Sequence, residues 1–237
     1  MQEKFSVEVG LMKKLVFDSS SLISISEKCF MNILGELAEN ENVEFLIPES
    51  VYFESVSRPL KIKKFELNAI RIKEAVDRGW LRVAREDRKL GKLISELSEI
   101  ANETAYSSRG KIILVDKGEL ESLALVKRTH ADALVIDERT TRMLVEEPQQ
   151  LKKILEKRLF EKVRLNKHSL QLFKNFVGKT RIIRSVELMA LAFEKNYFQK
   201  EFSRTRDALE AALYAMKFAG CAVSDHEIEQ YLKGALR

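Results

Sequence analysis

Cysteine, glycine, proline and histidine are all scarce in this chain. Its 237 residues include 2 Cys, 9 Gly, 3 Pro and 3 His. Cys29 and Cys221 lie far apart and form no CxxC pair, so we interpret them as buried small hydrophobic residues, with a disulfide or a metal pair as the alternative. The histidines are scattered and no HExxH motif occurs, which argues against a zinc enzyme. The few glycines and prolines predict many helices with short connections.

Long hydrophobic runs are also lacking. No stretch approaches the roughly 18 uncharged apolar residues of a membrane-spanning helix, so we expect no membrane association. Residues 1–14 are too charged for a secretory signal, and we expect a cytoplasmic protein. Hydrophobic residues make up 45% and charged residues 32%, which is typical of a globular chain. The high charge content with few Gln and Cys is also typical of thermophilic, archaeal-like proteins.

Positive charge is concentrated in two stretches. The formal net charge is +5, and residues 152–184 hold 11 Lys or Arg against 2 Asp or Glu. Residues 58–92 hold 12 basic and 5 acidic residues. Basic stretches beside acidic ones are typical of proteins that bind a polyanion around a carboxylate site. A solvated surface rich in Lys and Arg is the alternative.

Short apolar runs alternate with helical patterns in residues 1–150. We expect strands at 14–18, 43–48, 80–84 and 131–137, and either a strand or a loop at 111–116. We expect helices at 19–37, from about Glu49 through 56, at 60–79, 90–106, 118–128 and 138–146. This alternation predicts an α/β domain with a mainly parallel sheet covered on both faces. In residues 151–237 we expect a basic helical extension with helices at 151–160, 168–177, 185–196, 203–219 and 224–236.

Acidic residues stand at or shortly after the ends of several predicted strands. They are Asp18, Glu49, Glu54, Glu119, Glu121 and Asp137. The carboxyl ends of parallel strands meet at one edge of a sheet, so we expect several of these acids to converge there. Clustered carboxylates suit Mg²⁺ or Mn²⁺, which activates water and stabilises the oxyanions of a phosphodiester displacement. The alternative for each single acid is a helix N-cap or a turn residue.

Four segments together resemble the acidic motifs of PIN-domain proteins, in the same order. They are residues 14–23 (KLVFDSSSLI), 47–54 (IPESVYFE), 116–125 (DKGELESLAL) and 131–142 (ADALVIDERTTR). The resemblance implies a compact three-layer α/β/α endoribonuclease that hydrolyses phosphodiester bonds of single-stranded RNA. It also implies a homodimer.

The resemblance also implies roles for individual residues. The ligands of Mg²⁺ or Mn²⁺ would be Asp18, Glu54, Glu121 and Asp137. Ser20 would orient Asp18 through a hydrogen bond. Glu49 is the alternative to Glu54, and Glu119 is the alternative to Glu121. Arg139 and Arg142 would contact phosphate or form salt bridges.

The resemblance does not cover residues 151–237. This extension could serve as an RNA-binding arm, a lid, a dimer interface or a docking module for a protein partner. Its candidates for phosphate contact are Lys152, Lys153, Lys157, Arg158, Lys162, Arg164 and Lys167. Phe173 and Phe176 lie at helical spacing and are interpreted as core residues, with stacking on bases as the alternative.

Three other functions compete with a nuclease. The first is a catalytically silent scaffold that binds RNA or a ribonucleoprotein. The second is a phosphohydrolase with Asp18 as nucleophile, although that chemistry usually uses a D-x-D motif and this chain has Ser20 at the third position. The third is a regulatory domain on the same fold class.

Overall fold

The structure is a computed structural model that describes residues 13–235. Two predictions concern residues outside this range. Residues 1–12 belong to the N-terminal segment that is too charged for a secretory signal, and residue 236 ends the helix expected at 224–236. No helix within residues 13–235 combines the length and the apolar character needed to cross a bilayer.

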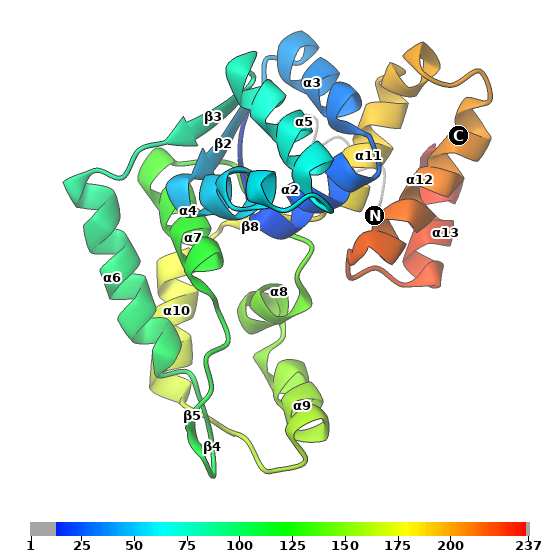
Figure 1. Ribbon diagram of the computed structural model, residues 1–237. Coiled ribbons are helices and arrows are strands. Elements are labelled where there is room, and N and C mark those ends of the chain that lie inside the picture. The colour runs from blue at the N-terminus through cyan, green and yellow to red at the C-terminus, as the bar shows by residue number, and fades with distance from the viewer. Residues whose placement is uncertain (1–12, 236–237) are drawn as a thin grey trace.

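Five parallel strands form the central sheet, in the order β3-β2-β1-β6-β8 (Figure 1). The strands are β1 (Lys14–Phe17), β2 (Glu44–Pro48), β3 (Leu81–Ala84), β6 (Ala133–Val135) and β8 (Arg181–Ile183). The chain runs outward from β1 through β2 to β3, then returns to place β6 and β8 on the other side of β1. The order therefore reverses between β1 and β6, where open α/β sheets bind their ligands.

Helices cover both faces of this sheet, as expected for a three-layer α/β/α fold. The first face carries α2 (Ser19–Glu27), α3 (Met31–Asn40), α5 (Glu66–Asp77), α11 (Ser185–Glu194), α12 (Thr205–Ala219) and α13 (Asp225–Ala235). The second face carries α6 (Arg88–Asn102), α7 (Lys117–Thr129), α8 (Arg139–Glu146), α9 (Pro148–Leu159) and α10 (Lys167–Val177). The short elements are α4 (Glu49–Tyr52), the π-helical turn η1 (Phe53–Ser57) and the 3-10 turns η2 (Pro59–Lys61) and η3 (Tyr197–Lys200).

Alternate residues of each strand supply the two cores. Leu15 and Phe17 pack into the first core, whereas Val16 between them packs into the second. This follows from the two-residue period of a strand, and it explains why the buried strands appear in the sequence as continuous apolar runs.

A small antiparallel sheet lies away from the central one, in the order β5-β4-β7. Its strands are β4 (Ala105–Ser107), β5 (Gly110–Lys111) and β7 (Arg164–Leu165). The helix expected at 90–106 therefore ends earlier, at Asn102, because the chain turns into β4. Of the ambiguous segment 111–116, only Lys111 belongs to a strand, and the rest is a loop that leads into α7.

Two expected helices are interrupted. The helix at 19–37 divides into α2 and α3, because Cys29 adopts a left-handed conformation with φ of 66°. Cys29 is exposed, so its expected burial is wrong, whereas Cys221 is buried as expected, and both thiols are free. The helix at 60–79 starts as the 3-10 turn η2, and its α-helical part begins only at Glu66.

The extension is not purely helical, because residues 181–183 form strand β8 beside β6. Three residues are too few to show an alternating pattern, which is why the sequence did not reveal this strand. Helix α10 lies beside α6 on one side of the sheet, and α11 to α13 lie on the other side (Figure 1). Helix α9 follows α8 and contributes Leu151 and Leu155 to the second core. Phe173 and Phe176 are buried in the second core, as the core interpretation predicted.

Candidate metal and active site

Asp18 stands at the carboxyl end of β1 and caps helix α2. Its Oδ2 accepts hydrogen bonds from the Ser20 backbone N–H at 2.9 Å and from the Ser20 hydroxyl at 2.7 Å. The latter is the bond expected of Ser20. Only 3% of the residue is exposed, and its Oδ1 is buried without a hydrogen-bond partner. A buried acceptor without a donor is costly, so this oxygen suggests an ion or a group that completes the site.

The first turn of α7 brings two further acids to Asp18. Asp116 Oδ1 accepts the Glu119 N–H at 2.9 Å, and Glu119 Oε2 accepts the Asp116 N–H at 2.7 Å. This reciprocal capping box fixes both side chains at the positive end of the helix dipole. Burial raises the pKa of Glu119 to about 8, and the charges of Asp116 and Asp18 contribute to the shift.

Glu54 joins these acids from the π-helical turn η1. Its pKa is raised, first by burial and then by the charges of Asp116 and Glu121, while the Ser19 hydroxyl opposes the shift. A Cβ atom added to Gly118 would lie 3.0 Å from Glu54 Oε2 and 3.5 Å from Asp116 Oδ1. Because position 118 is a glycine, the two carboxylates can approach α7 closely. Turns of this π type often occur at functional sites.

Glu121 is buried on α7 beside Glu54. Its Oε2 accepts the backbone N–H of Ser50 at 3.3 Å, and its Oε1 lies 3.6 Å from Lys117 Nζ. Glu49, the alternative to Glu54, is exposed at the start of α4. Glu119, the alternative to Glu121, lies with Asp18 and Asp116, whereas Glu121 lies with Glu54.

The electrostatics of this acidic cluster (Asp18, Glu54, Asp116, Glu119 and Glu121) favour a cation. Burial, with a smaller contribution from the charge of Asp116, raises the pKa of Asp18 to about 6, against the hydrogen bonds from Ser20. Carboxylates that raise one another's pKa lose this repulsion when a divalent ion lies between them.

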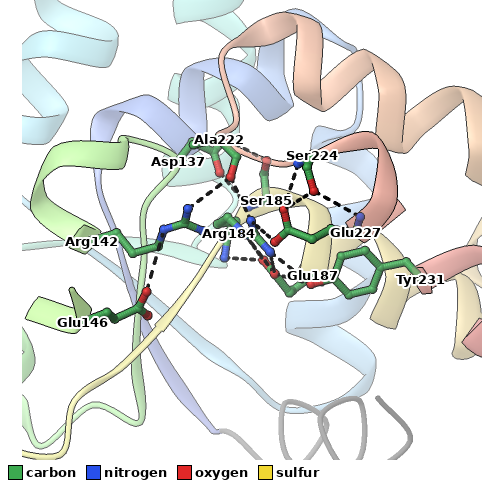
Figure 2. A network of polar contacts seen from close by, with 10 residues as sticks. All are labelled: Asp137, Arg142, Glu146, Arg184, Ser185, Glu187, Ala222, Ser224, Glu227 and Tyr231. Atoms are coloured by element: carbon green, nitrogen blue, oxygen red, sulfur yellow. Dashed lines mark hydrogen bonds and ion pairs between the residues drawn. The ribbon is translucent and has the colours of Figure 1, made fainter. Parts of the chain in front are cut away.

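The Asp137 carboxylate points elsewhere, toward the N-terminus of α11 (Figure 2). Its Oδ1 accepts the Ser185 N–H at 2.8 Å, and its Oδ2 accepts the Ser185 hydroxyl at 2.7 Å. Burial raises its pKa, and the charge of Glu187 adds to the shift. Its backbone N–H donates to Ser20 Oγ at 3.2 Å, and the Ser20 hydroxyl in turn donates to Asp18 Oδ2. Asp137 thus acts as an anionic cap for α11.

Arg184, the residue before α11, links α11, α13 and the segment between α12 and α13. It is 6% exposed and contacts Glu187 at 2.5 Å and Glu227 at 2.9 Å. Its guanidinium also donates to the Ala222 carbonyl at 2.8 Å (Figure 2). Arg142 donates to that carbonyl at 3.3 Å, so it takes part in an internal network, whereas Arg139 is exposed.

The acidic cluster fits a divalent cation chemically, although its side chains are not closed around one point. Within residues 13–235, no three Asp, Glu, His or Cys side chains are already gathered as a set of metal ligands. The donors on offer are carboxylate oxygens, which Mg²⁺ and Mn²⁺ prefer, and Asp18 Oδ1 is free to bind. Metal binding would therefore draw the Glu54 carboxylate, which lies outside the capping box, toward the other acids.

Two residues at this edge were missed from the sequence. No role is predicted for Asp116 from the sequence, although its D-x-x-E spacing with Glu119 is a recognisable capping box. Ser185 lies 48 residues from Asp137, and no local pattern in the sequence connects them.

A family model described as a PIN domain matches residues 14–152, which is more than half of the chain. No curated protein and no solved structure gives a significant match. The matched segment contains all the residues of the acidic cluster, and it ends within α9, before β8 and α11. The chain belongs to the PIN-domain family.

Proposed function

We propose that this protein is a metal-dependent endoribonuclease that hydrolyses phosphodiester bonds of single-stranded RNA. PIN domains are generally nucleases, typically use divalent metals and commonly bind RNA. The observation that carries the proposal is the buried Asp18 Oδ1, which has no hydrogen-bond partner and lies among other carboxylates.

Asp18, Asp116, Glu119 and Glu54 would hold Mg²⁺ or Mn²⁺. Two of the four ligands expected from sequence, Asp18 and Glu54, are kept in this proposal. The charge of Glu121 on α7 raises the pKa of Glu54, and a cation held by Glu54 would relieve this repulsion. When bound, the metal would supply Lewis-acid stabilisation of the phosphate oxygens and lower the pKa of the attacking water.

The residues of the chain perform the positioning. Ser20 holds Asp18 Oδ2 through two hydrogen bonds, which leaves Oδ1 without a hydrogen-bond partner. The capping box fixes Asp116 and Glu119 on a rigid helix start, which keeps the donor atoms oriented before substrate arrives. With a pKa of about 8, Glu119 retains its proton at pH 7 until a cation displaces it.

The scaffold without cleavage is the second candidate, and one observation favours it. Both oxygens of Asp137 are engaged by Ser185, so the fourth acidic motif presents no free carboxylate to the cluster. If three motifs do not assemble a competent site, RNA binding would remain without hydrolysis.

Cleavage of labelled single-stranded RNA in Mn²⁺, Mg²⁺ or EDTA distinguishes the two candidates. If the protein is a nuclease, the wild type should cleave the RNA only when metal is present, and Asp18→Asn should not cleave it. The control Glu49→Gln, which changes an exposed acid, should cleave it like the wild type. Salt-sensitive RNA binding without cleavage by the wild type would favour the scaffold instead.

A further inference from the structure

A cavity of about 400 Å³ opens beside the acidic cluster. Its walls are loop 112–116, Glu138 and Thr140 at the start of α8, and Leu155, Arg158 and Leu159 of α9. Asp116 and Glu119 belong both to this cavity and to the cluster. A substrate bound at the acids would therefore extend into a space whose other wall is α9.

One very exposed hydrophobic side chain lines this cavity, and another belongs to the residue that follows a lining residue. Ile113 in its loop wall is 74% exposed, and Phe160, which follows directly on Leu159, is 94% exposed. Among the large hydrophobic residues that the structure describes, only Phe218 on α12 reaches a similar exposure, 78%. Apolar side chains at such a rim suit a ligand with flat apolar faces.

The backbone at Phe160 gives a second indication. Phe160 ends α9 in the left-handed conformation, with φ of 55° and ψ of 32°. Glycine is the usual residue at such a helix end, because a side chain there is disfavoured. Since Phe160 buries almost nothing and sits in a disfavoured conformation, the fold itself gives no reason for an aromatic residue here.

Positive charge surrounds Phe160. Lys153, Lys157, Arg158 and Lys162 are all exposed on α9 or just after it. They belong to the stretch 152–184, with its 11 basic and 2 acidic residues. An exposed aromatic ring among cations is the combination that binds single-stranded nucleic acid, where bases stack and phosphates pair with Lys or Arg.

We infer that α9, Phe160 and loop 112–116 form a binding subsite for single-stranded RNA next to the acidic cluster. Arg158 contacts a phosphate, the apolar wall of the cavity receives a base, and Phe160 stacks on a base farther along the strand. The inference deepens the proposed function and rests on it for the class of substrate.

The test measures binding of a labelled oligouridine by fluorescence anisotropy, with the full chain, at low salt and in EDTA so that the RNA stays intact. Phe160→Gly is expected to weaken binding by about 5- to 150-fold, the range for loss of one stacked base. Its melting temperature should stay the same or rise, because glycine suits the left-handed conformation. Phe160→Trp should bind like wild type, as should the matched control Phe218→Ala. Arg158→Gln should weaken binding and reduce the logarithmic salt slope by about 0.7.

Wild-type RNA affinity in Phe160→Gly would overturn the subsite and leave this surface to a ligand of another class, such as a protein. The cleavage assay keeps the two proposals apart. Weakened binding in Phe160→Gly together with an inactive wild type would support the subsite and contradict the nuclease. An active wild type with unchanged binding in Phe160→Gly would contradict the subsite alone.

Discussion

Replacement of Asp18 by Asn should stabilise the metal-free protein at alkaline pH. The change removes a buried charge and keeps the shape of the side chain. Burial raises the pKa of Asp18 from 3.8 to about 6, which is equivalent to about 3 kcal/mol against the folded, ionised state. The Asn amide can still accept from Ser20, but its NH₂ group takes the place of the unpartnered Oδ1, and an unsatisfied NH₂ costs about 1–3 kcal/mol. The net gain should therefore be at most about 2 kcal/mol.

The stability difference between Asp18→Asn and the wild type should depend on pH. The folded state binds Asp18's proton more tightly than the unfolded state, so wild-type stability falls as pH rises from about 3.8 through about 6. The penalty is complete at pH 8 and absent near pH 4. Asp18→Asn should therefore gain stability over wild type at pH 8, and this gain should shrink as pH approaches 4.

Thermal unfolding in EDTA measures the effect. A gain of up to about 2 kcal/mol should raise the melting temperature at pH 8 by up to about 8 °C. The control Glu49→Gln alters an exposed acid near the same edge and should change nothing. An Asp18→Asn protein that is less stable than wild type by the same amount at both pH values would refute the electrostatic account.

Three further predictions follow from the same contacts. Mn²⁺ should raise the wild-type melting temperature more at pH 8 than at pH 6, because protons must leave Asp18 and Glu119 before these acids bind metal, and equal shifts would contradict the raised pKa values. Gly118→Ala should weaken Mn²⁺ binding in a calorimetric titration, because its Cβ would displace Glu54, while the unfolding free energy stays the same or rises by up to about 1 kcal/mol. Unchanged Mn²⁺ affinity would argue against a role for Glu54. Asp137→Ala should lose about 1–3 kcal/mol in urea unfolding, because the buried N–H and hydroxyl of Ser185 would lose their acceptor, and an unchanged unfolding free energy would contradict the capping role.

Much of the sheet could be predicted because its strands carry strong local patterns. The runs that end at Asp18 and Asp137 are short, apolar and flanked by helix starts, so their type and position follow from the sequence alone. Strand β8 has only three residues, and it can be recognised as a strand only from its pairing with β6. The distribution of α9 to α13 over both faces likewise depends on long-range packing, which local spacing does not encode.

The candidate site could be predicted in part for the same reason. Strand ends and motif order pointed to Asp18, Glu54 and Glu121, and the structure brings them to one edge. The direction of the Asp137 side chain depends on Ser185, which arrives there only through β8. The exposure of Phe160 depends on the left-handed end of α9, which the neighbouring residues do not predict.

The central claim is that the acidic cluster around Asp18 binds a catalytic divalent cation. Calorimetric titration of Mn²⁺ into the wild type, Asp18→Asn and Asp137→Asn tests it most directly. Asp18→Asn should abolish Mn²⁺ binding, whereas the Mn²⁺ affinity of Asp137→Asn should stay within a few-fold of the wild-type value. Wild-type affinity in Asp18→Asn would contradict the account.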